Sequence, residues 1–170
     1  PATDAATGRA TYFSKYDIVR DDYRAVMASC ALPGFCRPVK VGDRYYYDGG
    51  VADSIPLHHA IEQGCTKMVV ILSNPRNFVK KPEAHRPLYK HMLHKYPKTI
   101  QSIDNRHINY QASIDLACRL EKEGYVFIFA PSRHMPLSTF SKDAALEQDL
   151  YDLGVADYEA RAEELKHFLN

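Results

Sequence analysis

Residues 45–56 read YYYDGGVADSIP, and the interpretation of the whole chain depends on this stretch. Three tyrosines predict the end of a strand, and Asp48 follows directly, with Gly49 and Gly50 behind it. Glycines permit unusual backbone angles and leave space beside a carboxylate for a second element. Reactive side chains gather at strand ends in α/β sheets. Asp-Gly is also a common turn dipeptide, in which Asp48 would only bond the local backbone, and the spacing alone favours that simpler interpretation.

Two hairpins are predicted before this stretch. Residues 2–13 form the first around Thr7-Gly8, and residues 38–47 form the second around the two-residue turn Gly42-Asp43. A short helix over residues 23–30 separates them. Its predicted cap is Asp21 or Asp22, and its predicted apolar side carries Val26, Met27 and Cys30.

The remainder of the chain alternates helices and strands. A helix from Pro56 to Gly64 leads into the apolar run 68–72, which predicts a strand buried on both faces. After a loop over 74–87, we expect helices over 88–96 and 99–123 and a buried strand over 125–130. The second of these helices has a predicted buried stripe of Ile103, Ile108, Ala112, Leu116 and Leu120. Ser141 is the expected cap of a final helical region that is interrupted near Gly154 and ends around Leu169.

This alternation predicts an α/β fold with helices layered on a sheet. A net charge of +1 gives no general attraction for nucleic acid, so we expect no nucleic-acid partner. The four cysteines form no CxxC pair, which favours reduced, mostly buried thiols in a cytoplasmic protein. No paired Cys/His spacing of the zinc type is present, and we expect no metal and no cofactor.

Further motifs place the chain in a family. MASCALPGF at residues 27–35, PV at 38–39, YDGGV at 47–51 and Pro56 together resemble the second half of patatin-like phospholipases. The segment ATD at residues 2–4 with Thr7-Gly8 is similar to the strand that enters this region. The resemblance is strongest over residues 2–75 and looser over 124–131 and 150–154.

This resemblance implies a three-layer α/β/α fold and a Ser–Asp dyad that cleaves acyl esters of lipids. Asp48 maps onto the aspartate that activates the serine, and Gly49 and Gly50 shape the same motif. A serine hydroxyl is a poor nucleophile until an adjacent base takes its proton. The serine of a Gly-x-Ser-x-Gly turn and a glycine-rich oxyanion loop are absent from residues 1–170. We therefore expect residues 1–170 to be the C-terminal part of one patatin-like catalytic domain, inactive alone, with the missing elements upstream.

Other interpretations remain open. The chain could be a non-catalytic lipid- or protein-binding module with a relic motif, or a metal-dependent hydrolase using Asp48, Asp53 and histidines. Ser29 has no flanking glycine, Asp53 suits a structural role in its loop, and a surface role suits the pair His58-His59. His91 and His94 share a helix face without a third ligand. The basic side chains between residues 80 and 95 could touch anionic lipid head groups, which would give peripheral membrane contact.

Overall fold

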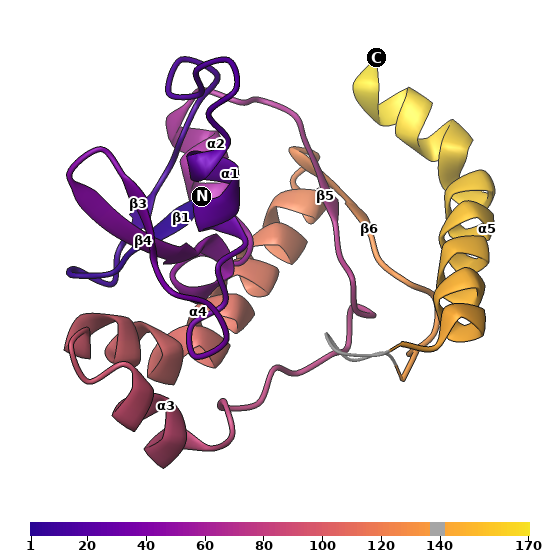
Figure 1. Cartoon of the computed structure of the whole chain (residues 1–170). Coiled ribbons are helices and arrows are strands. Elements are labelled where there is room, and N and C mark those ends of the chain that lie inside the picture. The colour runs from indigo at the N-terminus through magenta and orange to yellow at the C-terminus, as the bar shows by residue number, and fades with distance from the viewer. Residues whose placement is uncertain (137–141) are drawn as a thin grey trace. The chain divides into compact units, whose positions relative to one another are not determined.

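The computed structural model describes residues 1–136 and 142–170, which form two compact units. The first unit holds Pro1–Pro56 and Lys80–Ile114, and the second holds Leu57–Val79 and Asp115–Asn170. In chain order the elements are β1 (Ala2–Asp4), β2 (Ala10–Thr11), α1 (Arg24–Ser29), β3 (Val39–Val41), β4 (Arg44–Asp48), the 3-10 turn η1 (Gly49–Val51), α2 (Leu57–Glu62), β5 (Met68–Ile71), α3 (Arg86–Met92), α4 (Pro97–Lys122), β6 (Val126–Phe129) and α5 (Ala144–Leu169) (Figure 1). The mixed α/β class predicted from the sequence is confirmed.

The first unit is built on a four-stranded antiparallel sheet with the order β2-β1-β4-β3. Both predicted hairpins are present, since β1 pairs with β2 and β3 pairs with β4. The central pair joins segments far apart in the sequence, with Thr3 opposite Tyr47 and Ala2 opposite Asp48. This register brings the start of the chain alongside the strand that ends in Asp48.

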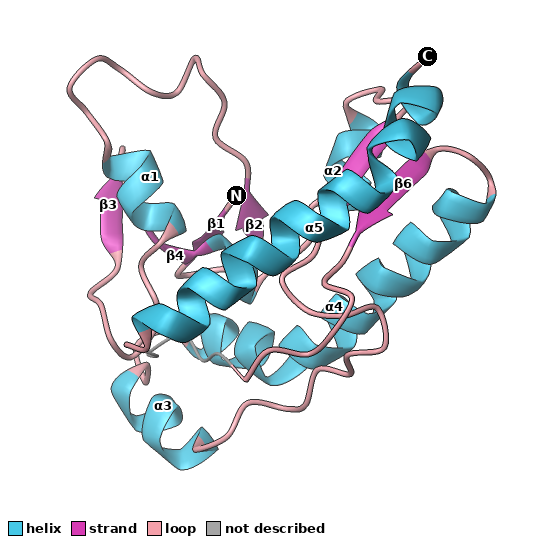
Figure 2. Ribbon diagram, turned by 90° about the vertical axis from the view of Figure 1, so that its right-hand side faces the viewer, coloured by secondary structure: helices cyan, strands magenta, loops and turns pink. Residues whose placement is uncertain are grey.

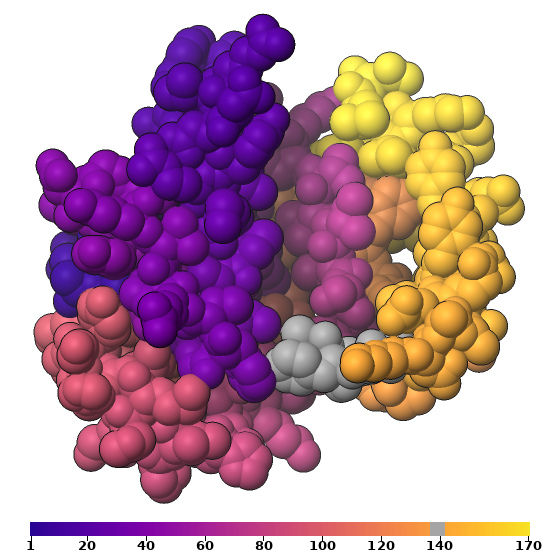
Figure 3. All heavy atoms as spheres, viewed as in Figure 1, coloured from indigo at the N-terminus to yellow at the C-terminus, as the bar shows by residue number. Residues whose placement is uncertain are grey.

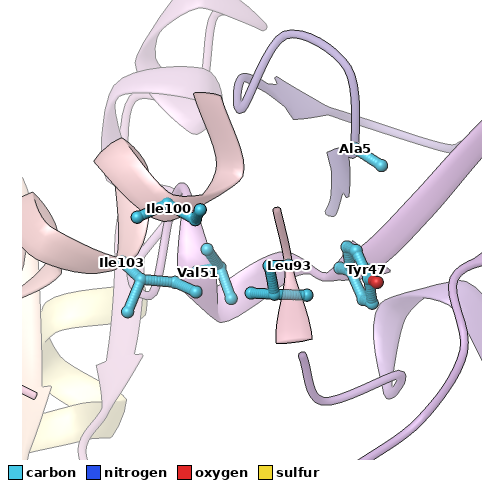
Figure 4. Close-up of a cluster of buried hydrophobic side chains, with 6 residues drawn as sticks. All are labelled: Ala5, Tyr47, Val51, Leu93, Ile100 and Ile103. Atoms are coloured by element: carbon cyan, nitrogen blue, oxygen red, sulfur yellow. The ribbon is translucent and has the colours of Figure 1, made fainter. Parts of the chain in front are cut away.

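Two apolar clusters lie against this sheet. One joins Tyr46 with Ala2 and Ala28, and the ring of Phe13 meets the ring of Tyr46 edge-on at 5.2 Å between centroids. The other combines side chains from β4, η1, α4 and the region that follows α3 (Figure 4). Its buried members are Ala5, Tyr47, Val51, Leu93, Ile100 and Ile103. Burial raises the pKa of Tyr47 to about 12, so this phenol stays protonated within the cluster.

The first turns of α4 dock on the loop between β1 and β2. Thr99 is fully buried, and its hydroxyl donates to the Ala5 carbonyl at 2.8 Å. Ser102 donates to the Gly8 carbonyl at 2.7 Å. Gly8 has a φ of +68°, and a Cβ at this position would overlap the Lys98 carbonyl oxygen. Only glycine therefore allows the helix to approach the loop this closely.

Asp4 organises the same loop from inside. Its Oδ1 accepts hydrogen bonds from the N–H groups of Ala6 and Thr7 at 3.0 and 2.8 Å and from the Thr7 hydroxyl at 3.1 Å. Its Oδ2 accepts from the Arg44 guanidinium at 3.0 Å. Burial raises the pKa of Asp4, but these hydrogen bonds outweigh burial and leave the pKa below its ordinary value.

The α1 helix forms where predicted but presents a different face. Its buried residues are Ala25 and Ala28, whereas Val26 and Met27 are about half exposed and Cys30 is exposed. Small alanine side chains let the helix lie close to β3 and β4, which a bulkier face would prevent. Its N-cap is Tyr23, without a side-chain cap bond, although Asp22 accepts from the Arg24 N–H at 3.1 Å. Residues 14–23, directly before α1, are largely exposed at the surface (Figure 3).

The predicted apolar stripe of α4 is also partly wrong. Ile103 and Leu116 are buried and Leu120 is partly buried, but Ile108 and Ala112 are exposed. The buried positions are Thr99, Ile100, Ile103, Ile114, Leu116 and Ala117. The helix is therefore covered by protein near its beginning and again after residue 113, so one continuous stripe does not describe it.

The second unit contains the parallel pair β5 and β6, with Met68 opposite Val126 and Ile71 opposite Phe129. The α5 helix packs on β6 (Figure 2), and the Arg161 guanidinium lies 4.3 Å from the centre of the Phe127 ring. β6 is buried as predicted. The prediction that β5 is buried on both faces is wrong, because Ile71 is 78% exposed. A strand alternates its side chains between two faces, and here one face of β5 is left uncovered.

The α5 helix runs without interruption through Gly154, contrary to the prediction of a break there. One glycine inside a long helix costs only about 1 kcal/mol, which the neighbouring turns tolerate. Ser141 lies outside the described residues, and the N-cap of α5 is Asp143, whose Oδ1 accepts from the N–H groups of Ala145 and Leu146.

The cysteines are free, as predicted, but they are not mostly buried. Cys30, Cys36 and Cys65 are exposed, and Cys118 is partly exposed. Cys30 is the C-cap of α1, and Cys36 and Cys65 lie in loops, whereas Cys118 lies within α4. Within the described residues, no helix combines the length and apolarity needed to cross a membrane.

Replacing Gly8 with alanine tests the docking of α4. Gly42 has a similar φ of +58° but open space around its Cα, so Gly42→Ala is the matched control. In both variants an alanine in the left-handed conformation should lower the free energy of unfolding by about 1–2 kcal/mol. Gly8→Ala should lower it by about 1–3 kcal/mol more, because its Cβ overlaps the Lys98 carbonyl. Urea unfolding measures both, and equal losses in the two variants would contradict the close approach.

Acid should weaken the fold through Asp4. Since its folded pKa lies below its unfolded value, its contribution to the free energy of unfolding is complete above about pH 4 and is lost as pH falls through the folded pKa. Asp4→Asn should therefore lower the free energy of unfolding by about 1.5–3 kcal/mol at pH 7. The difference in stability between this variant and the wild type should become smaller as the pH falls. Urea midpoints between pH 7 and pH 2 measure this gap, and a constant gap would count against the role of Asp4.

Candidate active site

Asp48 is the last residue of β4, where the strand gives way to η1. Its N–H donates to the carbonyl of Ala31 at 2.8 Å, which ties this strand end to the chain that follows α1. The residue is neither buried nor fully exposed. The carboxylate therefore lies at a strand terminus, as the sequence predicts.

The two oxygens of this carboxylate differ. Oδ1 accepts a hydrogen bond from the Gly50 N–H at 2.7 Å, which caps η1. Oδ2 has no hydrogen bond or ion pair to any of the described residues. One oxygen thus fixes the orientation of the side chain, and the other is left able to accept a proton.

Thr3 closes the turn from the neighbouring strand. Its hydroxyl donates to the Asp48 carbonyl at 2.7 Å and accepts from the Ala52 N–H at 3.2 Å. Thr3 is fully buried, so these bonds are shielded from water. A single side chain therefore spans the residues on both sides of the Gly49–Val51 turn. Thr3 lies within the family-like segment ATD at residues 2–4, but no pattern in the sequence points to a role for its side chain.

Both glycines of the motif have little room for a side chain. A Cβ at Gly49 would overlap the Pro1 carbonyl group. A Cβ at Gly50 would lie 3.0 Å from Oδ1 of Asp48 and 3.5 Å from Nη2 of Arg106. Gly49 thus faces mainly the Pro1 backbone, whereas Gly50 faces the ends of three side chains, one of which is the carboxylate itself.

Arg106 of α4 reaches this turn from a distant part of the sequence. Its Nε donates to the Gly50 carbonyl at 2.7 Å, and its Nη1 lies 3.0 Å from Oε1 of Glu83. The hydroxyl of Ser54 donates to the same Gly50 carbonyl at 2.7 Å. No motif surrounds Arg106, so the sequence carries no signal that would have found it.

The other candidates near Asp48 have different partners. Asp53 accepts from the Tyr12 hydroxyl at 2.5 Å, in keeping with a structural role in its loop. The Ser29 hydroxyl donates to the Pro1 carbonyl at 2.7 Å rather than to Asp48. Its hydrogen is therefore directed to a backbone carbonyl instead of to a base.

The histidines do not assemble into a metal centre within the part of the chain that is described. No group of three or more His, Cys, Asp or Glu side chains there could hold a metal ion. His94 Nδ1 lies 2.9 Å from the His91 carbonyl. His58 is exposed, and His59 lies 3.9 Å from Glu62 on the next turn of α2.

The basic side chains between residues 80 and 95 are partly paired with acids. Lys80 lies 3.5 Å from Glu83, and Arg86 makes a two-pronged ion pair with Asp104 at 2.8 and 2.7 Å. The Tyr89 hydroxyl also donates to Asp104 at 2.6 Å, and burial together with this carboxylate raises the pKa of Tyr89 to about 12. The contacts of Arg86 and Tyr89 with Asp104 hold α3 against α4, which is a structural use of the charges.

Comparison with known proteins matches this part of the chain to a family. Residues 4–61 match the family described as "Patatin-like phospholipase". This segment is similar to patatin-like phospholipases. The resemblance predicted from the sequence is therefore confirmed for the segment that carries Asp48, and the family it matches is one of lipid hydrolases.

A second family covers a different part of the chain. Residues 96–170 match a "Domain of unknown function (DUF6363)". Part of the chain also resembles a curated protein, "Uncharacterized protein YjjU" of Escherichia coli (strain K12), with 39% identity over 59 residues. These residues are 34% of this chain and 16% of that protein. Thr99, Ser102 and Arg106 lie outside the patatin-like match, although they contact it.

The two glycines of the motif should respond differently to alanine. Gly49→Ala meets backbone and should destabilise the fold by about 1–3 kcal/mol. Gly50→Ala meets only side-chain ends, which can move, so it should cost less than about 1 kcal/mol while displacing the Asp48 carboxylate. Urea unfolding of both variants measures the difference, and the reverse order would contradict the observed packing of the turn.

Proposed function

We propose that the chain supplies the aspartate of a patatin-like serine hydrolase that cleaves acyl ester bonds of lipids, with Asp48 as the base of a Ser–Asp dyad. The supporting observation is the carboxylate at the strand end: Oδ1 is held by the Gly50 N–H, and Oδ2 is without a partner among the described residues. The patatin-like match over residues 4–61 supports the choice of reaction.

The proposed chemistry needs one proton transfer to Asp48. Oδ2 would take the proton of a serine hydroxyl, and the resulting nucleophile attacks the ester carbonyl. Backbone N–H groups of a glycine-rich loop would stabilise the oxyanion that forms. The bond from Gly50 contributes by holding the carboxylate in one orientation, because misplaced groups lose much of their catalytic effect.

The serine and the oxyanion loop are proposed to come from residues outside these 170. No glycine in the chain is followed two positions later by serine, so no Gly-x-Ser-x-Gly is present. The aligned relative is several times longer than the matched segment, which makes up 16% of it. The coding sequence upstream of Pro1 tests this directly, and an open frame without the serine motif would favour a non-catalytic binding module.

The activity is tested in the full-length protein that contains this chain. Asp48→Asn should lower kcat for a p-nitrophenyl acyl ester by about 10²- to 10⁴-fold, the usual contribution of a general base. Asp53→Asn is the matched control, since it removes a nearby carboxylate that bonds Tyr12, and it should keep most of the turnover. Circular dichroism checks that both variants fold, and a fluorophosphonate probe should label the wild type. Retained turnover in Asp48→Asn would remove Asp48 from the dyad.

A further inference from the structure

We propose that Arg106 is a positioning residue for Asp48, supplied by a part of the chain that lies outside the patatin-like match. This inference rests on the proposed function of Asp48. Its basis is a continuous set of contacts through Gly50. The Gly50 N–H donates to Oδ1 of Asp48, and the Gly50 carbonyl accepts from Nε of Arg106, each at 2.7 Å.

Arg106 and Asp48 also share the space beside the Gly50 Cα. A Cβ at this position would be 3.0 Å from Oδ1 of Asp48 and 3.5 Å from Nη2 of Arg106. The guanidinium and the carboxylate therefore flank the same carbon. The peptide groups on both sides of Gly50 are held by charged side chains, and the flexible glycine turn is restrained at the residue that orients the carboxylate.

Arg106 is itself held in place. Its Nη1 pairs with Glu83 at 3.0 Å, and Glu83 also lies 3.5 Å from Lys80. The Lys80 ammonium in turn lies 5.9 Å from the centre of the Tyr110 ring on α4. A planar guanidinium can donate to Gly50 and Glu83 in two fixed directions, which a lysine ammonium does not reproduce. The identity of the side chain therefore matters as well as its charge.

The role predicted for Arg106 is one of orientation. It contacts the turn and Glu83, so its loss should lower kcat while leaving KM nearly unchanged. Displacement of a catalytic group by about 1 Å can cost about 100-fold in rate. Without Arg106, the Gly50 carbonyl keeps the hydroxyl of Ser54 as its remaining side-chain donor among the described residues.

The experiment uses the full-length protein that contains this chain and a p-nitrophenyl acyl ester. Arg106→Gln should lower kcat by about 10- to 100-fold with little change in KM, and Arg106→Lys should recover only part of the loss. Arg86→Gln is the matched control, because it also breaks an ion pair to α4, with Asp104, but has no contact with Gly50. It should keep wild-type kcat. Equal losses in Arg106→Gln and Arg86→Gln, or wild-type kcat in Arg106→Gln, would overturn the inference.

Two further measurements keep the test decisive. Ser54→Ala removes the other donor to the Gly50 carbonyl from an exposed position, so it should fold and show a smaller fall in kcat. Amide hydrogen exchange over residues 45–55 should speed up in Arg106→Gln and Arg106→Lys but not in Arg86→Gln, independently of any turnover. Unchanged exchange in both Arg106 variants would refute the positioning role. Retained turnover in Asp48→Asn would instead refute the proposed function, so the two failures are distinguishable.

Discussion

The first turns of α4 lie in direct contact with the loop between β1 and β2, and the rest of the first unit depends on this contact. The Lys98 carbonyl lies so close to Gly8 that no side chain would fit at this position. The buried Thr99 hydroxyl donates to the Ala5 carbonyl. A buried carbonyl without a hydrogen-bond partner lowers the free energy of unfolding. The Thr99 hydroxyl therefore supplies the partner that the Ala5 carbonyl needs, and the same bond holds the helix on the loop. Ile100 and Ile103 then reach the apolar cluster beside β4 (Figure 4).

This docking has a consequence for the candidate site. Once α4 is seated, Arg106 lies two turns beyond Thr99 and meets the Gly50 carbonyl. Thr3 approaches the same turn from β1 and bonds the Asp48 carbonyl. The turn that orients the carboxylate is thus held by segments from the beginning and the later part of the chain, in addition to its own residues. Two of these segments match different families, so the site draws on both.

Much of the fold could be predicted from local patterns. Both hairpins follow from glycine turns between strand-forming residues, and α1, α2, α3, α4 and β6 lie near their predicted positions. The predictions of which side chains each helix or strand buries were less successful. Hydrophobicity favoured Val26 and Met27 on α1, whereas the sheet accepts only the smaller Ala25 and Ala28. Likewise Ile108 and Ile71 are exposed, because no other element of the described chain covers them.

The sequence by itself determined the strand that ends in Asp48, the glycine turn behind it and the family resemblance, because these depend on neighbouring residues. Only the tertiary structure decided which of the carboxylate oxygens has no partner among the described residues, and that Thr3 and Arg106 support the turn. Thr3 lies 45 positions and Arg106 58 positions from Asp48 in the chain. Contacts over such separations arise from strand register and helix docking, and no local pattern of residues encodes them.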